Sequence, residues 1–305
     1  MQNPRFESDA KESVRLLLTD AIDYAGLFPP AGLSMPEAVI SFATYRNSNY
    51  SWMLGRFVVT ASRLDEFFDI ARDFISRDDE QPWRISVIVG QDVKGDLETI
   101  RDFNQANGHG IVCDAVEIKA ETSSMVENVA EDLPVGASAY FEVPLDERLT
   151  DLIAAISMAG QRAKIRTGGL TPDSFPNTTE IIRFVRTCLG ANVLFKATAG
   201  LHHPIRCFRP LTYESDAPMG TMHGFLNLFL MTGFALDGYR PTLLNDVMEE
   251  EFDEVFRFED QSVIWRENFI LNLVQIGRIR SLGIQSFGSC SFEEPIGDLQ
   301  KLGVL

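Results

Sequence analysis

Cysteine is scarce in this chain and is spread along it without a paired motif. No CxxC sequence occurs. This spacing argues against a disulfide framework or a zinc ribbon, and it fits a protein of the reducing cytoplasm. The four cysteines are Cys113, Cys188, Cys207 and Cys290.

The sequence also lacks a long apolar run. The longest, GFLNLFLMTGFAL at 224–236, contains Asn227 and is shorter than the roughly 20 residues that a membrane span needs. We therefore predict a buried or interfacial helix there and no membrane partner. The first residues, MQNPRFESDAKESVRLLLTDAI, contain no apolar signal core before their charges, so we expect a cytoplasmic location.

Positive charge is in short supply. Lys and Arg total 27 against 44 Asp and Glu, which gives a net charge of −17 and an isoelectric point of about 4.6. Nucleic acids and anionic membranes bind basic patches, so this balance argues against both as partners. No GxGxxG fingerprint follows the first predicted strand, which argues against a dinucleotide-binding fold, and we expect no cofactor.

What the sequence does contain is a regular alternation of short β-like runs with helical patterns, which is typical of a parallel sheet. Six such runs lie between residues 55 and 200, and runs at 21–28 and 284–292 complete a set of eight. Because α/β barrels use about 250 residues in one domain, we predict a single (β/α)₈ TIM-barrel domain over residues 1–305. The six central runs are 55–62, 83–90, 113–121, 138–145, 162–169 and 193–200.

The regular spacing is broken once, between the last two predicted strands. Residues 201–282 contain three stretches whose apolar residues fit helical periods: GFLNLFLMTGFALDG, LLNDVMEEEFDEVFRF and VIWRENFILNLVQIGRIRSLG. We predict a helical insertion at about 201–282. It is a candidate lid, or a subunit interface through which the chain would form a homo-oligomer.

Charged residues lie on one face of four consecutive predicted strands. Alternate residues of a strand point the same way, so Lys164 and Arg166 share a face, as do Cys113, Glu117 and Lys119. The complementary positions are apolar enough to pack on helices. One barrel interior would then receive six charged side chains: Glu117, Lys119, Glu142, Lys164, Arg166 and Lys196.

Charges inside a barrel are costly unless they are paired, and barrel active sites lie at the C-terminal strand ends. A structural ion-pair network is one interpretation of this face, and a catalytic site is the favoured one. A buried lysine beside other cations loses its proton more readily, so its amine can form a Schiff base with a carbonyl carbon. A nearby carboxylate can move protons. Arg166 is suited to grip a carboxylate of the substrate.

At these residues the chain resembles the deoxyribose-phosphate aldolase family of class I aldolases. The resemblance runs over nearly the whole barrel, through IDYAGLFPPA, FVVTASRLDEFFDIA, CDAVEIKAE and AYFEVPLDE, and is strongest in KIRTGG and FKATAG. It implies that Lys164 forms the Schiff base, that Lys196 tunes it electrostatically, and that Glu117 is the acid/base group.

The chain also departs from the family pattern. The family usually has Asp in place of Glu117 and a small residue in place of Arg166. The family binds phosphate with glycine-rich ends of the last two strands, whereas here those ends read TAGLHHP and FGSCSF. The family also has no counterpart of residues 201–282. We therefore expect a small aldehyde or keto substrate, with Arg166 favouring a carboxylated one.

His202 and His203 follow the seventh predicted strand, where barrel loops carry function, and we expect them to contact substrate. Asp23, at the end of the first strand, is a further substrate-binding candidate, together with Lys119 and Glu142. With His223 the histidines lack HxH or HxxxH spacing, so we expect no metal. A metal-assisted hydrolase or isomerase that uses these histidines, and a non-catalytic barrel for binding or assembly, are the alternatives.

Overall fold

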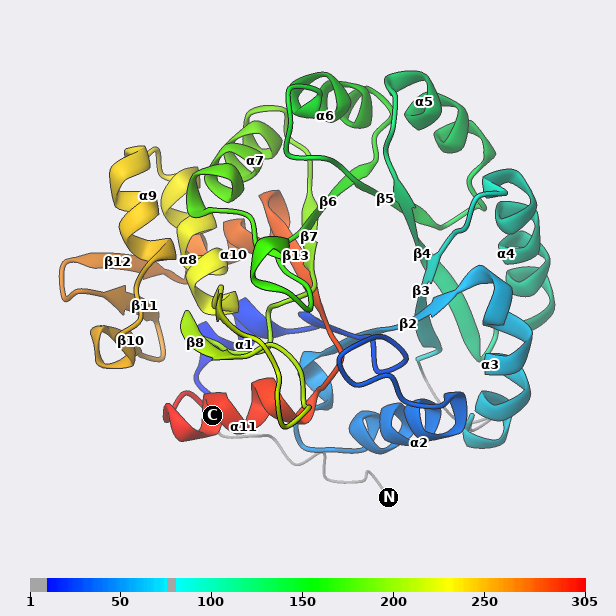
Figure 1. The fold of residues 1–305 in the computed structure, drawn as a ribbon, viewed down its shortest axis with the longest axis horizontal. Coiled ribbons are helices and arrows are strands. Elements are labelled where there is room, and N and C mark those ends of the chain that lie inside the picture. The colour runs from blue at the N-terminus through cyan, green and yellow to red at the C-terminus, as the bar shows by residue number, and fades with distance from the viewer. Residues whose placement is uncertain (1–9, 76–80) are drawn as a thin grey trace.

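Eight parallel strands close into a barrel in the computed structural model, which describes residues 10–75 and 81–305 (Figure 1). All eight predicted strands are present, and the chain is a (β/α)₈ TIM barrel. Neighbouring strands follow chain order around the barrel, and the last strand pairs with both β7 and β1. The strands are β1 (Ile22–Tyr24), β2 (Leu54–Thr60), β3 (Trp83–Ile88), β4 (Ile111–Lys119), β5 (Ser138–Glu142), β6 (Arg162–Arg166), β7 (Phe195–Thr198) and β13 (Ile284–Ser289).

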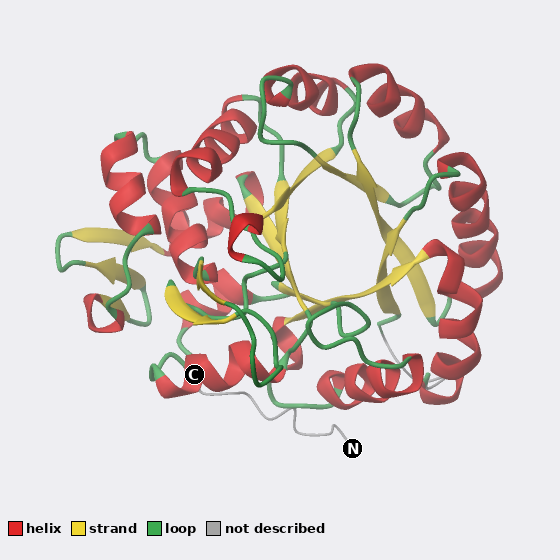
Figure 2. Ribbon diagram, viewed as in Figure 1, coloured by secondary structure: helices red, strands yellow, loops and turns green. Residues whose placement is uncertain are grey.

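Helices form a ring outside the strands (Figure 2). Their starts are encoded locally: Ser34 with Glu37, Asn177 with Glu180, and Asn272 with Gln275 each form a reciprocal capping box. The ring contains α2 (Met35–Arg46), α3 (Leu64–Ala71), α4 (Val93–Asn107), α5 (Ser123–Asp132), α6 (Leu149–Met158), α7 (Thr178–Gly190), α10 (Leu273–Leu282) and α11 (Glu293–Lys301), and α1 (Glu12–Leu18) precedes β1 and packs on α10.

Each barrel strand presents one face to the helices and the other to the barrel interior. Val116 and Ile118 of β4 and Phe141 of β5 are buried in the apolar core between strands and helices. Glu117 and Tyr140, at the alternating positions, are as deeply buried but lie outside that apolar cluster. The alternation therefore directs polar side chains inward, as the sequence pattern predicts.

An irregularity in β4 corrects the predicted orientation of Cys113. Ile85 pairs with Cys113 and Ser86 with Ala115, so Asp114 is an extra residue in the ladder. Cys113 consequently belongs to the core under the helices, while Asp114 faces the N-terminal end of the barrel. Similar register shifts occur in β2 and β13.

The insertion between β7 and β13 is only partly helical, which corrects the prediction for 201–282. A hairpin of β8 (Cys207–Pro210) and β9 (Met219–Met222) comes first, followed by α8 (Phe225–Leu236) and α9 (Pro241–Met248). A three-stranded antiparallel sheet then lies outside the helix ring, beside α8 and α9 (Figure 1). Its strands are β10 (Phe256–Phe258), β11 (Ser262–Trp265) and β12 (Phe269–Asn272).

The small sheet escaped prediction because its strands are only three or four residues long and their apolar residues also fit a helical period. Arg266 and Glu267 both take positive φ, at 46° and 58°, and turn the chain between β11 and β12. Trp265 packs on Phe234 of α8, with ring centroids 6.1 Å apart. Tertiary packing thus decides the conformation of this stretch.

Helix α8 fulfils the prediction of a buried helix at 224–236, since residues 225–234 are all buried. Phe225 stacks on Phe287 of β13 with ring centroids 4.7 Å apart. Among the described helices, none is both long and apolar enough to span a bilayer.

Candidate active site

Glu117 is the centre of a buried cluster of charges inside the barrel. Its Oε2 accepts a hydrogen bond from Lys164 Nζ at 2.7 Å, and its Oε1 lies 2.5 Å from Lys196 Nζ. Ser86 Oγ also donates to Oε1, at 2.7 Å. Burial alone would raise the pKa of Glu117, but the two ammonium groups outweigh it and hold that pKa well below its usual range.

Lys196 and Asp23 form a fully buried ion pair in the barrel interior, below Glu117 and outside the cavity lining. Lys196 Nζ lies 2.8 Å from Asp23 Oδ2, which also accepts from Ser286 Oγ at 2.8 Å. The ammonium is 4.9 Å from the centroid of the Tyr140 ring. Burial disfavours the charged form of Lys196, yet the carboxylates of Asp23 and Glu117 raise its pKa above the ordinary value, and Lys196 lowers that of Asp23. Both side chains are sealed from solvent.

Lys164 lies nearer the cavity than this ion pair, and its ammonium group contacts two carboxylates. Its Nζ is 2.7 Å from Glu142 Oε2 as well as from Glu117 Oε2. Arg166, two residues further along β6, places Nε 3.3 Å from the other oxygen of Glu142. Burial opposes ionisation of Glu142, but Lys164 and Arg166 lower its pKa. The three cations and three carboxylates of the cluster are therefore balanced in charge.

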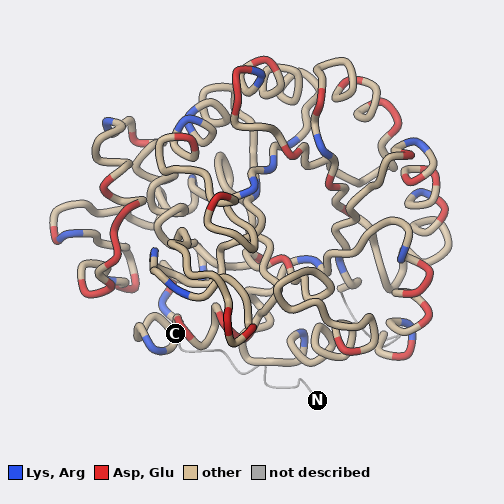
Figure 3. Tube along the Cα trace, viewed as in Figure 1, with Lys and Arg blue, Asp and Glu red and all other residues tan. Residues whose placement is uncertain are grey.

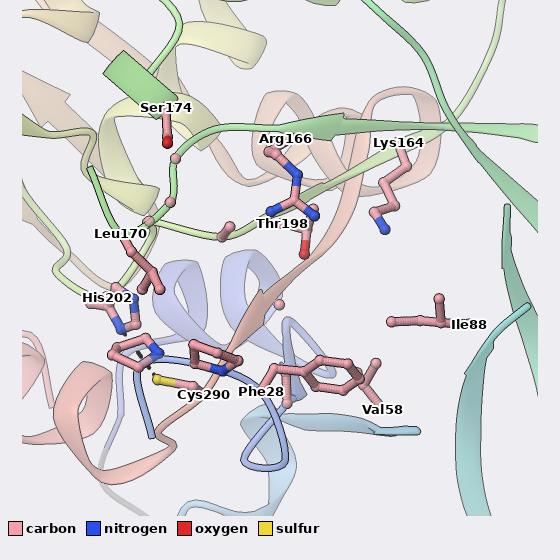
Figure 4. Close-up of a pocket in the computed structure, with 18 of the residues that line it drawn as sticks. Phe28, Val58, Ile88, Lys164, Arg166, Leu170, Ser174, Thr198, His202 and Cys290 are labelled. Atoms are coloured by element: carbon pink, nitrogen blue, oxygen red, sulfur yellow. Dashed lines mark hydrogen bonds between the residues drawn. The ribbon is translucent and has the colours of Figure 1, made fainter. Parts of the chain in front are cut away.

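A cavity of about 450 Å³ opens above Lys164 at the C-terminal ends of the strands (Figure 4). Lys164 extends from β6 toward its centre, and Arg166 projects into it from the same strand, while His202 and Cys290 lie at the opposite side. Asp23, Glu142 and Lys196 are not part of the lining. The wall is completed largely by Ala25, Phe28, Pro29, Pro30, Val58, Ile88, Glu117, Gly168, Gly169, Leu170, Ser174, Thr198, Ala199, Gly200 and Gly288.

Two glycines allow the β6 and β7 ends to approach each other at the rim of the cavity. A Cβ added to Gly168 would lie 2.9 Å from Gly200 Cα and 2.5 Å from the ring of Phe175. Ala199 and Gly200 have φ values of 62° and 75°, in the left-handed region that disfavours side chains. The GG and AG sequences after the two lysines thus shape the rim.

His202 and His203 line one cavity together, whereas His223 lies elsewhere. His202 lines the main cavity and a neighbouring one of about 180 Å³, and its Nδ1 lies 3.3 Å from Glu294 and 3.9 Å from Cys290 Sγ. His203 lines only the smaller cavity and pairs with Asp298 at 2.6 Å. His223 Nε2 lies 2.8 Å from the Pro176 carbonyl oxygen. Within residues 10–75 and 81–305, no three His, Cys, Asp or Glu side chains are placed to hold a metal ion.

Lys119, the sixth charged residue predicted to face the barrel interior, lies away from the cluster. It stands at the exposed end of β4, and its side chain does not line the cavity. The strand parity is as predicted, but β3 ends at Ile88, which pairs with Glu117, whereas β4 continues to Lys119. Position 119 therefore lies beyond the rim on the β3 side.

The sequence interpretation missed Ser86 and Ser286, which hold Glu117 and Asp23 in place. Each is a small hydroxyl residue at an inward position of an apolar strand, in WRISVIV and in IQSFGS. A hydroxyl residue at an inward position beside the charged strands is the signal that could have identified them.

Fold and site together define a (β/α)₈ barrel with a buried lysine–carboxylate cluster under a cavity at its C-terminal face. A search of protein-family models and of curated proteins with this chain returned no match.

Proposed function

We propose that this protein is a class I aldolase-like lyase that forms a Schiff base between Lys164 and a small aldehyde or keto substrate. The observation that carries the proposal is the position of Lys164. Among the described residues that line the cavity it is the only lysine, and its ammonium touches two carboxylates that can take up its proton. Lys196 is sealed beneath it and serves as its electrostatic partner.

The proposed chemistry begins when Lys164 gives a proton to a neighbouring carboxylate and its free amine attacks the carbonyl carbon. A C–N bond forms, and the carbonyl oxygen leaves as water once it has been protonated, which gives an iminium ion. Carbon–carbon cleavage then sends the bonding pair into the iminium, while Glu117 accepts the proton of the substrate hydroxyl. Cleavage leaves an enamine, and Glu117 returns the proton to the enamine carbon. Hydrolysis of the iminium formed in this way releases the second product and frees Lys164. The buried ion pairs keep every step close to charge balance.

Arg166 supports a carboxylated substrate. Its contact with Glu142 is made through Nε, and its terminal nitrogens are directed toward the cavity (Figure 4). A guanidinium recognises a carboxylate through two parallel hydrogen bonds. A 2-oxo acid or an aldehyde acid would place its carbonyl near Lys164 and its carboxylate on Arg166.

Sodium borohydride trapping with a panel of aldehydes and 2-oxo acids tests the proposal. We expect a reduced adduct on Lys164 by peptide mass spectrometry, and its loss in Lys164→Arg, because a guanidinium is not a usable amine nucleophile. Lys94→Arg, on the exposed face of α4, is the matched control and should keep the adduct. Arg166→Gln should weaken trapping of the oxo acids about tenfold to a hundredfold and spare uncharged aldehydes.

The outcomes separate the proposal from its rivals. An adduct on Lys196 would exchange the roles of the two lysines. Adducts confined to exposed lysines, or none across the panel, would contradict the Schiff-base function.

A further inference from the structure

A second cavity, of about 340 Å³, opens at the opposite, N-terminal end of the barrel and is lined almost entirely by polar atoms. The residues around it come from the beginnings of strands or from the segments just before them. The lining consists of Asp20, Arg56, Arg84, Asp114, Gly136, Ser138, Arg162, Arg280 and Gln285. None of these residues belongs to the lysine cluster described above.

Positive charge is in excess here, in contrast to the balanced cluster at the other end. Arg56 makes a two-pronged contact with Asp114, at 2.6 and 2.9 Å. Arg84 contacts the same carboxylate at 2.9 Å and Asp20 at 3.5 Å. Both acidic residues of the lining are thereby paired with Arg56 and Arg84. The other two arginines of the lining have no carboxylate partner among residues 10–75 and 81–305. In a chain of net charge −17, this local surplus runs against the overall composition.

Arg162 and Arg280 are those two arginines. Arg162 donates to Tyr140 Oη at 2.8 Å and forms no ion pair with a described residue. Arg280 donates to the backbone carbonyls of Leu17 and Gln285, and its buried Nε has no hydrogen-bond partner in the described part of the chain. Burial lowers the pKa of Arg280 to about 10, although Asp20 and Asp23 oppose the shift.

We propose that the N-terminal mouth of the barrel binds a phosphate group, either as free phosphate or at the end of a small metabolite, between Arg84, Arg162 and Arg280. A phosphate carries between −1.5 and −2 charges near neutral pH, so it matches the surplus of two cations. Guanidinium groups recognise its oxygens through paired hydrogen bonds, and the Ser138 hydroxyl at the same wall adds a donor.

An isothermal titration with inorganic phosphate, glycerol phosphate and succinate tests this site. We expect one phosphate per chain, and binding about tenfold to a hundredfold weaker in Arg162→Gln. Arg84→Gln should show a similar loss, and because Arg84 does not touch Tyr140 it serves where Arg162→Gln fails to fold. Arg166→Gln is the matched control: it removes a guanidinium from the same strand and face at the other end of the barrel, and phosphate binding should persist.

Tighter binding of glycerol phosphate than of phosphate would identify a phosphorylated metabolite as the occupant, and equal binding would identify free phosphate. The proposal is overturned if the wild-type chain does not bind phosphate at millimolar concentration, or binds only succinate. It is also overturned if binding survives both Arg162→Gln and Arg84→Gln, or disappears in Arg166→Gln. Loss of trapping at Lys164 would leave this site untouched, so the two proposals fail independently.

Discussion

Among single residues, Glu117 controls how charge is shared between the two lysines. Each of its oxygens faces a different ammonium group, so the repulsion between Lys164 and Lys196 is offset by a carboxylate placed between them. A lysine pair without such a carboxylate would favour the neutral amine by repulsion alone. In this barrel, Lys164 contacts two carboxylates, which are the proton acceptors of the proposed reaction.

Replacement of Glu117 by Gln separates amine attack from proton transfer. We expect borohydride trapping at Lys164 to persist in Glu117→Gln, because Glu142 still contacts the lysine. Without borohydride, exchange of the proton on the carbon next to the carbonyl of a ketone that reacts at Lys164, followed in D₂O by NMR, should slow by about 10²- to 10⁴-fold. Glu142→Gln is the comparison, and its effect should be smaller because Glu142 does not line the cavity. A larger loss in Glu142→Gln would transfer the acid/base role to that residue.

Among the elements, β6 and β7 with their following loops carry most of the proposed site. The strand faces bring Lys164 and Lys196 to directly paired positions, and the loops after them meet at Gly168 and Gly200. Phe175, in the loop that precedes α7, covers both glycines. The rim of the cavity therefore depends on the absence of side chains at two positions.

Gly168→Ala should disturb that rim. The added methyl would lie 2.5 Å from the Phe175 ring and 2.9 Å from Gly200 Cα, so one of the loops must shift. We expect a loss of about 1–3 kcal/mol in the free energy of unfolding, measured in urea, together with weaker trapping at Lys164. Gly190→Ala, at the end of α7, is the matched control, since nothing lies within 4 Å of its added Cβ. Equal stability of the two variants would contradict the role assigned to the close approach.

The same elements show how far the sequence could be used to predict the structure. Period-two alternation and local turn residues were enough for all eight barrel strands and for the inward direction of Lys164, Lys196 and Glu117, because these are local properties. The irregularity at Asp114 and the sheet of β10, β11 and β12 depend on contacts with distant segments. The rim position of Lys119 depends on how far the neighbouring strand β3 extends. The local sequence pattern does not encode these contacts between distant segments.

For the whole molecule, the distribution of charge matters more than its sum. The chain carries −17 overall, yet the barrel interior holds a balanced cluster at one end and a cationic surplus at the other. Tyr140 lies between them: its ring faces Lys196, while its hydroxyl accepts from Arg162 and donates to Gln285. The negative charge is carried mainly by the outer helices and loops, away from the two cavities proposed to bind anions (Figure 3).

The pH dependence of global stability should reveal one of these buried charges, that of His202. Burial disfavours the imidazolium, but contacts with Cys290 and Glu294 outweigh it and raise the pKa of His202 from 6.5 to about 9. A group whose pKa is raised on folding stabilises the protein fully below its unfolded value, and that contribution disappears as pH rises through the folded one. Between pH 6.5 and 9, the wild-type protein should therefore lose up to about 3 kcal/mol of unfolding free energy relative to His202→Asn.

Urea unfolding at several pH values checks this expectation, with His109→Asn as the control because His109 is exposed at the end of α4. The control should follow the wild-type curve at every pH, whereas the His202→Asn curve should be flatter across the window. Glu294 is ionised in both the folded and the unfolded chain at these pH values, since its pKa is lowered from an already acidic value. Glu294 therefore adds nothing to the pH dependence of the free energy of unfolding in this range. Parallel curves for wild type and His202→Asn would mean that the contacts of His202 with Cys290 and Glu294 do not depend on a charged imidazole.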